Sequence, residues 1–153
     1  MIIREKYTKS AKLNNLSGSI IFFSDNKSQI KNINNLLNNS QNNLLKKNLK
    51  NNVKKKEIFS FDISHNQKII IYSIKKNMPF EKKGAKLYEF FKKENLTKIH
   101  IFGDTIENSN NIKSLHELVH GMKLKSYSFD KYLTKKNSEI INVNVISRKK
   151  VDL

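Results

Sequence analysis

Apolar runs of strand length alternate along this chain with segments of helical periodicity, and this order constrains the fold more than any other feature. Runs rich in isoleucine, valine and phenylalanine predict five strands, at residues 19–24, 57–63, 68–74, 99–102 and 139–146. The short polar stretch 64–67 separates the second run from the third, so these two are expected to form a hairpin. Strands separated by helices, with one hairpin, indicate an α/β domain in which helices flank a mixed sheet.

The helices are predicted from apolar residues that recur every three or four positions. In residues 30–53 this spacing is present on both sides of an asparagine-rich stretch near 38–43, which predicts two short helices with a break between them. After the break at Pro79, a helix is expected over 81–95, with Leu87, Phe90 and Phe91 facing the core. Another is expected over about 110–124, and its core stripe is Ile112, Leu115, Val119 and Met122.

The length of 153 residues suits a single domain with a core of its own. No apolar run approaches the roughly 18 to 20 residues of a membrane helix. The first residues, MIIREKYTKS, lack the apolar stretch and cleavage site of a secretory signal. The chain contains no cysteine, so it has neither disulfides nor thiolate metal ligands. We therefore expect a cytoplasmic protein that does not associate with a membrane.

The net charge of +17 comes from 30 basic and 13 acidic residues. Such a field favours nucleic acid or another polyanion as a partner. Only Arg4 and Arg148 are arginine, however, and asparagine and isoleucine are abundant as well. These residues and lysine have codons rich in A and T, so genome composition is an alternative source of the charge. Proteins that read bases or clamp phosphates commonly use the planar fork of arginine.

His116, Glu117 and His120 spell H-E-x-x-H, the zinc-protease motif in which two histidines one helical turn apart hold the metal. A working site needs a third protein ligand. Ser126 stands where the longer variant of the motif has its third histidine. Another variant takes a glutamate from a later helix, but Glu139 opens an alternating, strand-like run. We interpret the pentapeptide as a chance match and expect no metal in this chain.

The residues after this pentapeptide, GMKLKSYSFDKY followed by TKK, resemble a segment of the leucyl (cytosol) aminopeptidases. In that family a helix ends in a glycine, which is followed by leucine, tyrosine, phenylalanine and a second tyrosine, and then by a lysine-rich turn. The matching positions are Gly121, Leu124, Tyr127, Phe129, Tyr132, Lys135 and Lys136. The leucine and the aromatic side chains are expected to pack the chain that leaves the helix onto the sheet.

The resemblance lies in the N-terminal domain of these enzymes, and the order of elements over 1–153 follows that domain. It implies a macro-domain-like fold and a single, non-catalytic N-terminal-type domain that serves hexamer assembly and substrate access. The family's two divalent metal ions, zinc or manganese, belong to a C-terminal catalytic domain that releases N-terminal amino acids from peptides. Its Asn-Thr-Asp-Ala-Glu-Gly-Arg signature does not occur here, so no catalytic, cofactor or metal residue can be assigned. The chain is expected to be inactive alone, as a fragment or a free-standing domain whose partner is the catalytic domain.

Two further functions compete with this interpretation. The first is a basic module that binds DNA or RNA, as some bacterial relatives of the family do, through Lys131, Lys135 and Lys136 in the turn after the motif helix. The second, from fold analogy alone, is binding of ADP-ribose-like groups. The chain has only four glycines and no glycine-rich phosphate loop, which disfavours the second.

Overall fold

Six strands and three α-helices follow one another along the part of the chain that the computed structural model describes, residues 2–25, 29–33, 36–52, 55–74, 78–106, 111–130 and 139–151. With two short 3-10 helices, η1 and η2, the order is β1 (Ile2–Thr8), η1 (Leu13–Asn15), β2 (Gly18–Ser24), α1 (Asn39–Asn52), β3 (Ile58–Ser64), β4 (Gln67–Ser73), α2 (Phe80–Lys93), β5 (Lys98–Phe102), η2 (Gly103–Thr105), α3 (Asn111–Asp130) and β6 (Ile140–Ile146).

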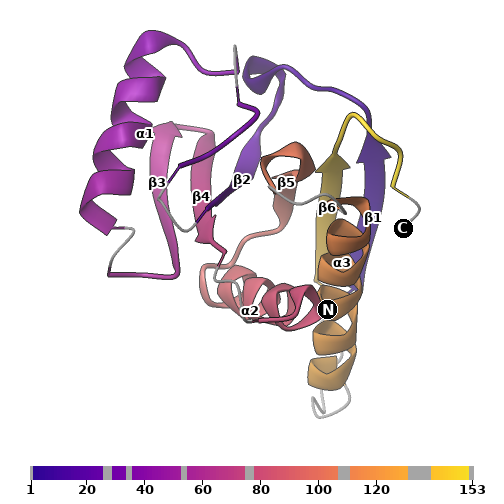
Figure 1. The fold of residues 1–153 in the computed structure, drawn as a ribbon. Coiled ribbons are helices and arrows are strands. Elements are labelled where there is room, and N and C mark those ends of the chain that lie inside the picture. The colour runs from indigo at the N-terminus through magenta and orange to yellow at the C-terminus, as the bar shows by residue number, and fades with distance from the viewer. Residues whose placement is uncertain are drawn as a thin grey trace.

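The strands form one mixed sheet in the order β1-β6-β5-β2-β4-β3 (Figure 1). The neighbours from β1 to β4 are parallel, and β3 alone runs antiparallel, as the second arm of a hairpin with β4. Both described ends of the chain lie on the β1–β6 side of the sheet in Figure 1. The mixed α/β sheet and the hairpin, both predicted from the sequence, are thereby confirmed.

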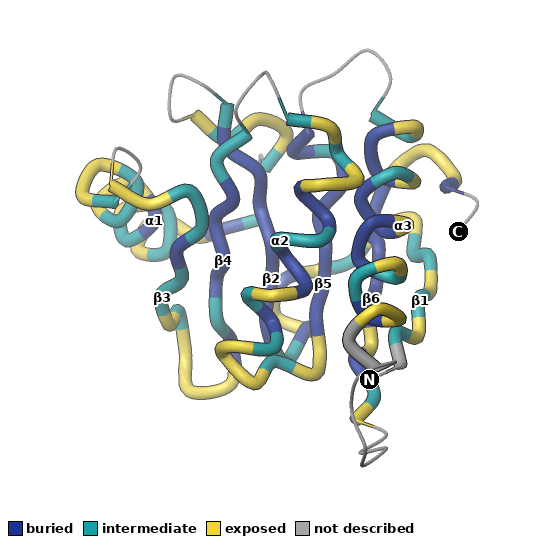
Figure 2. The backbone as a smooth tube through the Cα atoms, turned by 90° about the horizontal axis from the view of Figure 1, so that it is seen from below, coloured by how far each residue is buried: buried dark blue, intermediate teal, exposed yellow. Residues whose placement is uncertain are grey.

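The core has two layers, one on each face of the sheet. On one face α2 and α3 pack against alternate residues of the strands, among them Ile21, Ile70 and Val143. On the other face α1, the segment between β1 and β2 and the segment after β2 cover Ile20, Phe22 and neighbouring residues. Figure 2 shows strands β2 and β4 mostly buried, whereas α1 carries a broad exposed surface. These two strands are therefore covered on both sides, as is usual for the strands of parallel sheets.

The prediction of two helices in residues 30–53 is wrong, because α1 is the only helix among the described residues of this range and it begins inside the asparagine-rich stretch. Asn38 explains the start of the helix. Its side-chain oxygen accepts a hydrogen bond from the backbone N–H of Gln41 at 2.8 Å, and Gln41 Oε1 accepts one from the N–H of Asn38 at 3.0 Å. This reciprocal cap satisfies N–H groups that the first helical turn leaves free. Ile30 and Ile33 pack on the core from non-helical backbone instead.

Two further elements differ from the prediction. Strand β1 was not expected, because its apolar residues Ile3 and Tyr7 are interrupted by charged ones. Its seven residues pair in parallel with all of β6, and this long-range pairing defines the strand. Helix α3 continues to Asp130, six residues beyond the predicted end. Within the described residues no helix is long and apolar enough to cross a membrane.

Candidate functional site

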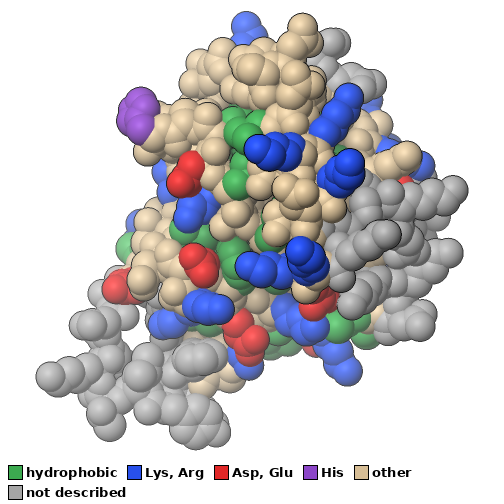
Figure 3. All heavy atoms as spheres, turned by 90° about the vertical axis from the view of Figure 1, so that its left-hand side faces the viewer, with side chains coloured by type: hydrophobic (Ala, Val, Ile, Leu, Met, Phe, Trp, Pro, Cys, Tyr) green, Lys and Arg blue, Asp and Glu red, His purple; other side chains and the backbone are tan. Residues whose placement is uncertain are grey.

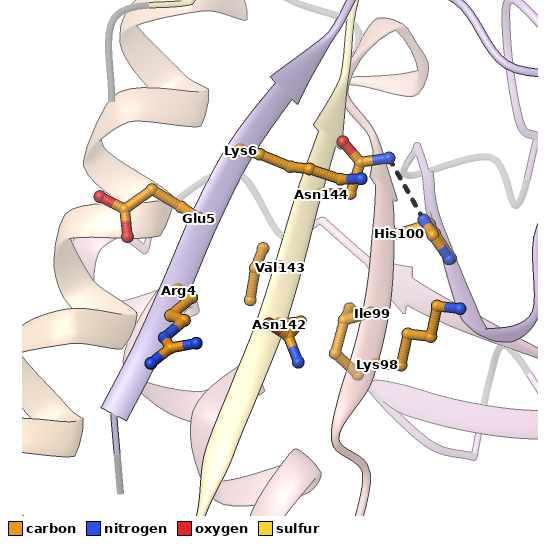
Figure 4. Close-up of a pocket in the computed structure, with 9 residues that line it drawn as sticks. All are labelled: Arg4, Glu5, Lys6, Lys98, Ile99, His100, Asn142, Val143 and Asn144. Carbon is orange, nitrogen blue, oxygen red and sulfur yellow. Dashed lines mark hydrogen bonds between the residues drawn. The ribbon is translucent and has the colours of Figure 1, made fainter.

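The first residues of β1, β6 and β5 present a polar surface on the face of the sheet opposite α2 and α3. Helix α1 lies at the β3–β4 end of the sheet and does not reach these strands (Figure 1). Strand pairing places the polar side chains in two rows, each crossing three strands in register: Arg4–Asn142–Lys98 and Lys6–Asn144–His100. We call these six residues the open sheet face. Together with Glu5, Ile99 and Val143 they line a cavity of about 420 Å³ (Figure 4).

The row nearer the connection between β1 and β2 is held by a chain of hydrogen bonds. Thr8 Oγ1 donates to Asn144 Oδ1 at 2.7 Å, and Asn144 Nδ2 lies 3.3 Å from His100 Nδ1. On the other side of the ring, His100 Nε2 lies 3.0 Å from the carbonyl oxygen of Ser17. A carbonyl only accepts and an amide NH₂ only donates, so the ring is satisfied when it is neutral with its proton on Nε2.

Burial agrees with this protonation state. His100 and Asn144 are 5% and 6% exposed. Burial lowers the pKa of His100 below its ordinary value, and nearby Lys98 and Lys6 lower it further, against the opposing effect of the hydrogen bond to Ser17. His100 therefore forms an uncharged inner wall of the cavity.

The cationic side chains of this face are exposed and have no carboxylate partner among the described residues. Arg4 and Lys6 make no ion pair with these residues, and Lys98 Nζ donates to Ser17 Oγ at 2.7 Å. Glu5 belongs to the same strand, but its side chain points to the opposite face and pairs with Lys123 of α3 (Figure 4). This face was not predicted, because β1 is not among the strands predicted from the sequence. The alternation of Arg4 and Lys6 with Ile3, Glu5 and Tyr7 was the available signal.

A second cluster lies where α2 begins. Lys83 is 2% exposed, and its Nζ lies 4.2 Å from the centre of the Phe80 ring. Burial lowers the pKa of Lys83, and the nearby carboxylate of Glu57 opposes that effect. Glu57 accepts a hydrogen bond from Lys86 Nζ at 2.9 Å. The cluster joins α2 to the start of β3, and its contacts account for it as part of the core.

The histidines of the H-E-x-x-H pentapeptide are both exposed, on the side of α3 away from the core. Glu117 lies between them in sequence and is 3.9 Å from Lys113 in an i,i+4 ion pair. His116 and His120 line a cavity of about 40 Å³ together with Val119 and Lys123. Among the described residues, no group of three or more histidine, aspartate or glutamate side chains could hold a metal ion.

Gly121 lies inside α3, whereas in the family that this segment resembles the helix ends at the matching glycine. A Cβ at Gly121 would lie 2.7 Å from the carbonyl carbon of Glu81, so the glycine permits close approach of α2. Leu124 and Tyr127 are 49% and 77% exposed, and their predicted packing onto the sheet is wrong. Because the helix continues, they remain on its outer surface. The side chain of Phe129 and residues Lys131, Tyr132, Lys135 and Lys136 lie outside the described part of the chain.

Comparison with solved structures reveals similar folds, and two of the matching proteins are informative. A mutant of tomato leucine aminopeptidase superposes on 98% of this chain with a TM-score of 0.66 and 14% sequence identity. The macrodomain of Thermus aquaticus DarG superposes on 95% of this chain and 99% of its own, with a TM-score of 0.59 and 8% identity. No family model and no curated protein matches the sequence. The chain thus has a macro-like α/β fold.

The chain spans about one third of the aminopeptidase, 33% of its length. The similarity lies in the N-terminal region of that enzyme. It agrees with the resemblance in the segment that begins at Gly121, although the local role predicted for that segment differs from the observed one. At these identities the likeness concerns the fold alone.

Proposed function

We propose that this chain is a non-catalytic N-terminal-type domain of a leucyl-aminopeptidase-like metallopeptidase, serving assembly and substrate access. The observation that supports it is the superposition of 98% of the chain on one third of tomato leucine aminopeptidase. The macrodomain match by itself supports only the shared fold, because its identity is 8%. In this proposal the residues that hydrolyse peptides belong to a catalytic domain that works with this one.

The described side chains of this domain do not fit the pair of divalent zinc or manganese ions that such an enzyme would use. Two-metal hydrolases hold their ions with several carboxylate or imidazole ligands. The described residues offer no group of three such side chains, and Glu117 beside the two exposed histidines is near Lys113. No step of peptide hydrolysis is therefore assigned to this chain.

The proposal is tested by comparing two preparations on a leucyl chromogenic substrate with added zinc or manganese. Recombinant 1–153 is expected to release no chromophore. Native protein, purified by an epitope tag placed on this chain in its own cells, is expected to show hydrolysis that a chelator abolishes. Untagged cells taken through the same purification are the control. The proposal would be contradicted if recombinant 1–153 hydrolysed the substrate. It would also be contradicted if the tagged native preparation were no more active than the untagged control.

A further inference from the structure

The open sheet face combines three exposed cationic side chains with a recessed floor and no opposing carboxylate. Some basic residues elsewhere are paired with carboxylates: Lys86 with Glu57, Lys125 with Glu89 and Arg148 with Asp104. On the side of the molecule shown in Figure 3, acidic side chains are interspersed among the basic ones. The positive potential of the open sheet face is therefore not neutralised locally, and low-dielectric walls concentrate such a field.

The spacing of these groups suits a linear anion. Arg4 and Lys6 are two residues apart on β1, which places their Cα atoms about 7 Å apart along the strand. Lys98 is on β5, two strand spacings or about 10 Å across the sheet from Arg4. Between them Asn142 is exposed, and its amide can donate and accept hydrogen bonds. A chain of negative groups lying across the floor would meet several of these side chains in succession.

We infer that the open sheet face binds the sugar–phosphate backbone of a single-stranded nucleic acid. The recess is three strands wide and is bounded by the buried pair Asn144–His100, so it admits one strand more readily than the broad cylinder of a duplex. Asn142 can reach base edges or hydroxyls that a single strand leaves accessible. The face has no aromatic side chain for base stacking, so its affinity comes mainly from phosphate contacts, which carry no sequence information directly. This inference does not rest on the proposed peptidase role.

The main experiment measures binding of a fluorescently labelled oligodeoxythymidine by anisotropy at several salt concentrations. The test variant carries Arg4→Gln, Lys6→Gln and Lys98→Gln, which removes the three cations while keeping polar side chains. Each phosphate contact on a single strand contributes about 0.7 to the slope of log affinity against log salt, so losing three lowers that slope by about 2. When the salt concentration is lowered from about 200 to 50 mM, the fold-increase in affinity of the variant is then roughly twenty times smaller than that of the parent.

The matched control removes the same amount of charge from another surface. Lys46, Lys47 and Lys50 are exposed on α1, and the triple glutamine variant there lowers the net charge by three as well. The control is expected to keep nearly the salt slope of the parent. Equal loss of affinity in the two variants would assign binding to overall charge and overturn the inference, and so would no loss in either.

Two further measurements keep the result decisive. Asn142→Asp places a carboxylate at the centre of the outer row and is expected to weaken binding of the oligonucleotide; unchanged affinity would count against the site. A duplex of equal length is expected to bind more weakly than the single strand. Equal or tighter duplex binding would overturn the assignment to single strands. Circular dichroism of each variant verifies that its fold is retained.

Discussion

Replacing Gly84 with alanine tests the closest approach of α2 to α3. A Cβ at this position would lie 2.9 Å from the carbonyl carbon of Leu118 and 3.0 Å from the backbone nitrogen of Met122, and closer still to the Leu118 carbonyl oxygen. All three are backbone atoms within α3, so no side chain can rotate away to make room. The two helices would have to separate, which would loosen the core that they form with the sheet.

The cost follows from two opposing terms. Overpacking a well-filled core costs about 1–3 kcal/mol, and a backbone clash lies at the upper end of that range. Alanine favours a helix over glycine by about 1 kcal/mol, which offsets part of it. The free energy of unfolding should therefore fall by about 2 kcal/mol, and the melting temperature by roughly 4–8 °C for a domain of this size.

Urea unfolding followed by far-UV circular dichroism measures this change. Lys82→Ala serves as control, because Lys82 is exposed on the same helix and its replacement should change stability by no more than about 0.5 kcal/mol. Gly84→Ala that is neutral or stabilising would show that the helices do not touch at this point, and would refute the reasoning.

Gly121→Ala probes the same interface from the other helix. Its Cβ would meet the backbone of Glu81, at 2.7 Å from the carbonyl carbon. Separation of the helices relieves both clashes together, so the Gly84→Ala/Gly121→Ala variant should lose clearly less stability than the sum of the single losses. Additive losses would mean that the two glycines do not depend on a common distance between the helices.

The remaining predictions concern histidines. Burial lowers the pKa of His100, so the folded state favours the neutral ring. The stability that the neutral ring contributes is complete above about pH 6.5, the ordinary pKa of histidine in the unfolded chain. It is lost as the pH falls from that value toward the lowered pKa of the folded state. The stability of the parent relative to His100→Gln should therefore shrink between about pH 7.5 and 5.5, and a constant difference in urea titrations would disprove this. For the other pair, His116→Ala/His120→Ala should leave zinc binding in equilibrium dialysis unchanged and near zero, whereas stoichiometric zinc in the parent that the variant loses would establish a metal site.

Several elements could be predicted from local pattern alone. The hairpin of β3 and β4, the strands β2, β5 and β6 and the helix α2 all have strong periodicity or runs of β-branched residues. The asparagine-rich stretch in residues 30–53 was wrongly predicted to break two helices. Asn38 instead caps the start of α1. Pattern counts do not distinguish an asparagine that ends one helix from one that begins the next.

The candidate site could not be predicted in the same way, because it is assembled by strand pairing. Arg4, Lys98 and Asn142 are distant in sequence and become one row only through parallel pairing of β1 and β5 with β6. Conversely, the H-E-x-x-H pentapeptide is local in sequence, but its histidines are exposed without a third ligand among the described residues.

The sequence by itself determined the class of the fold, because alternation of apolar and polar residues decides which segments can become strands or helices and which of their faces are buried. It also determined the net charge of +17. Only the tertiary structure decided where that charge is left unpaired, and that Gly121 is a helix contact rather than a helix end. Both depend on distances between segments far apart in the chain, which are set by packing and strand register and which no local pattern encodes.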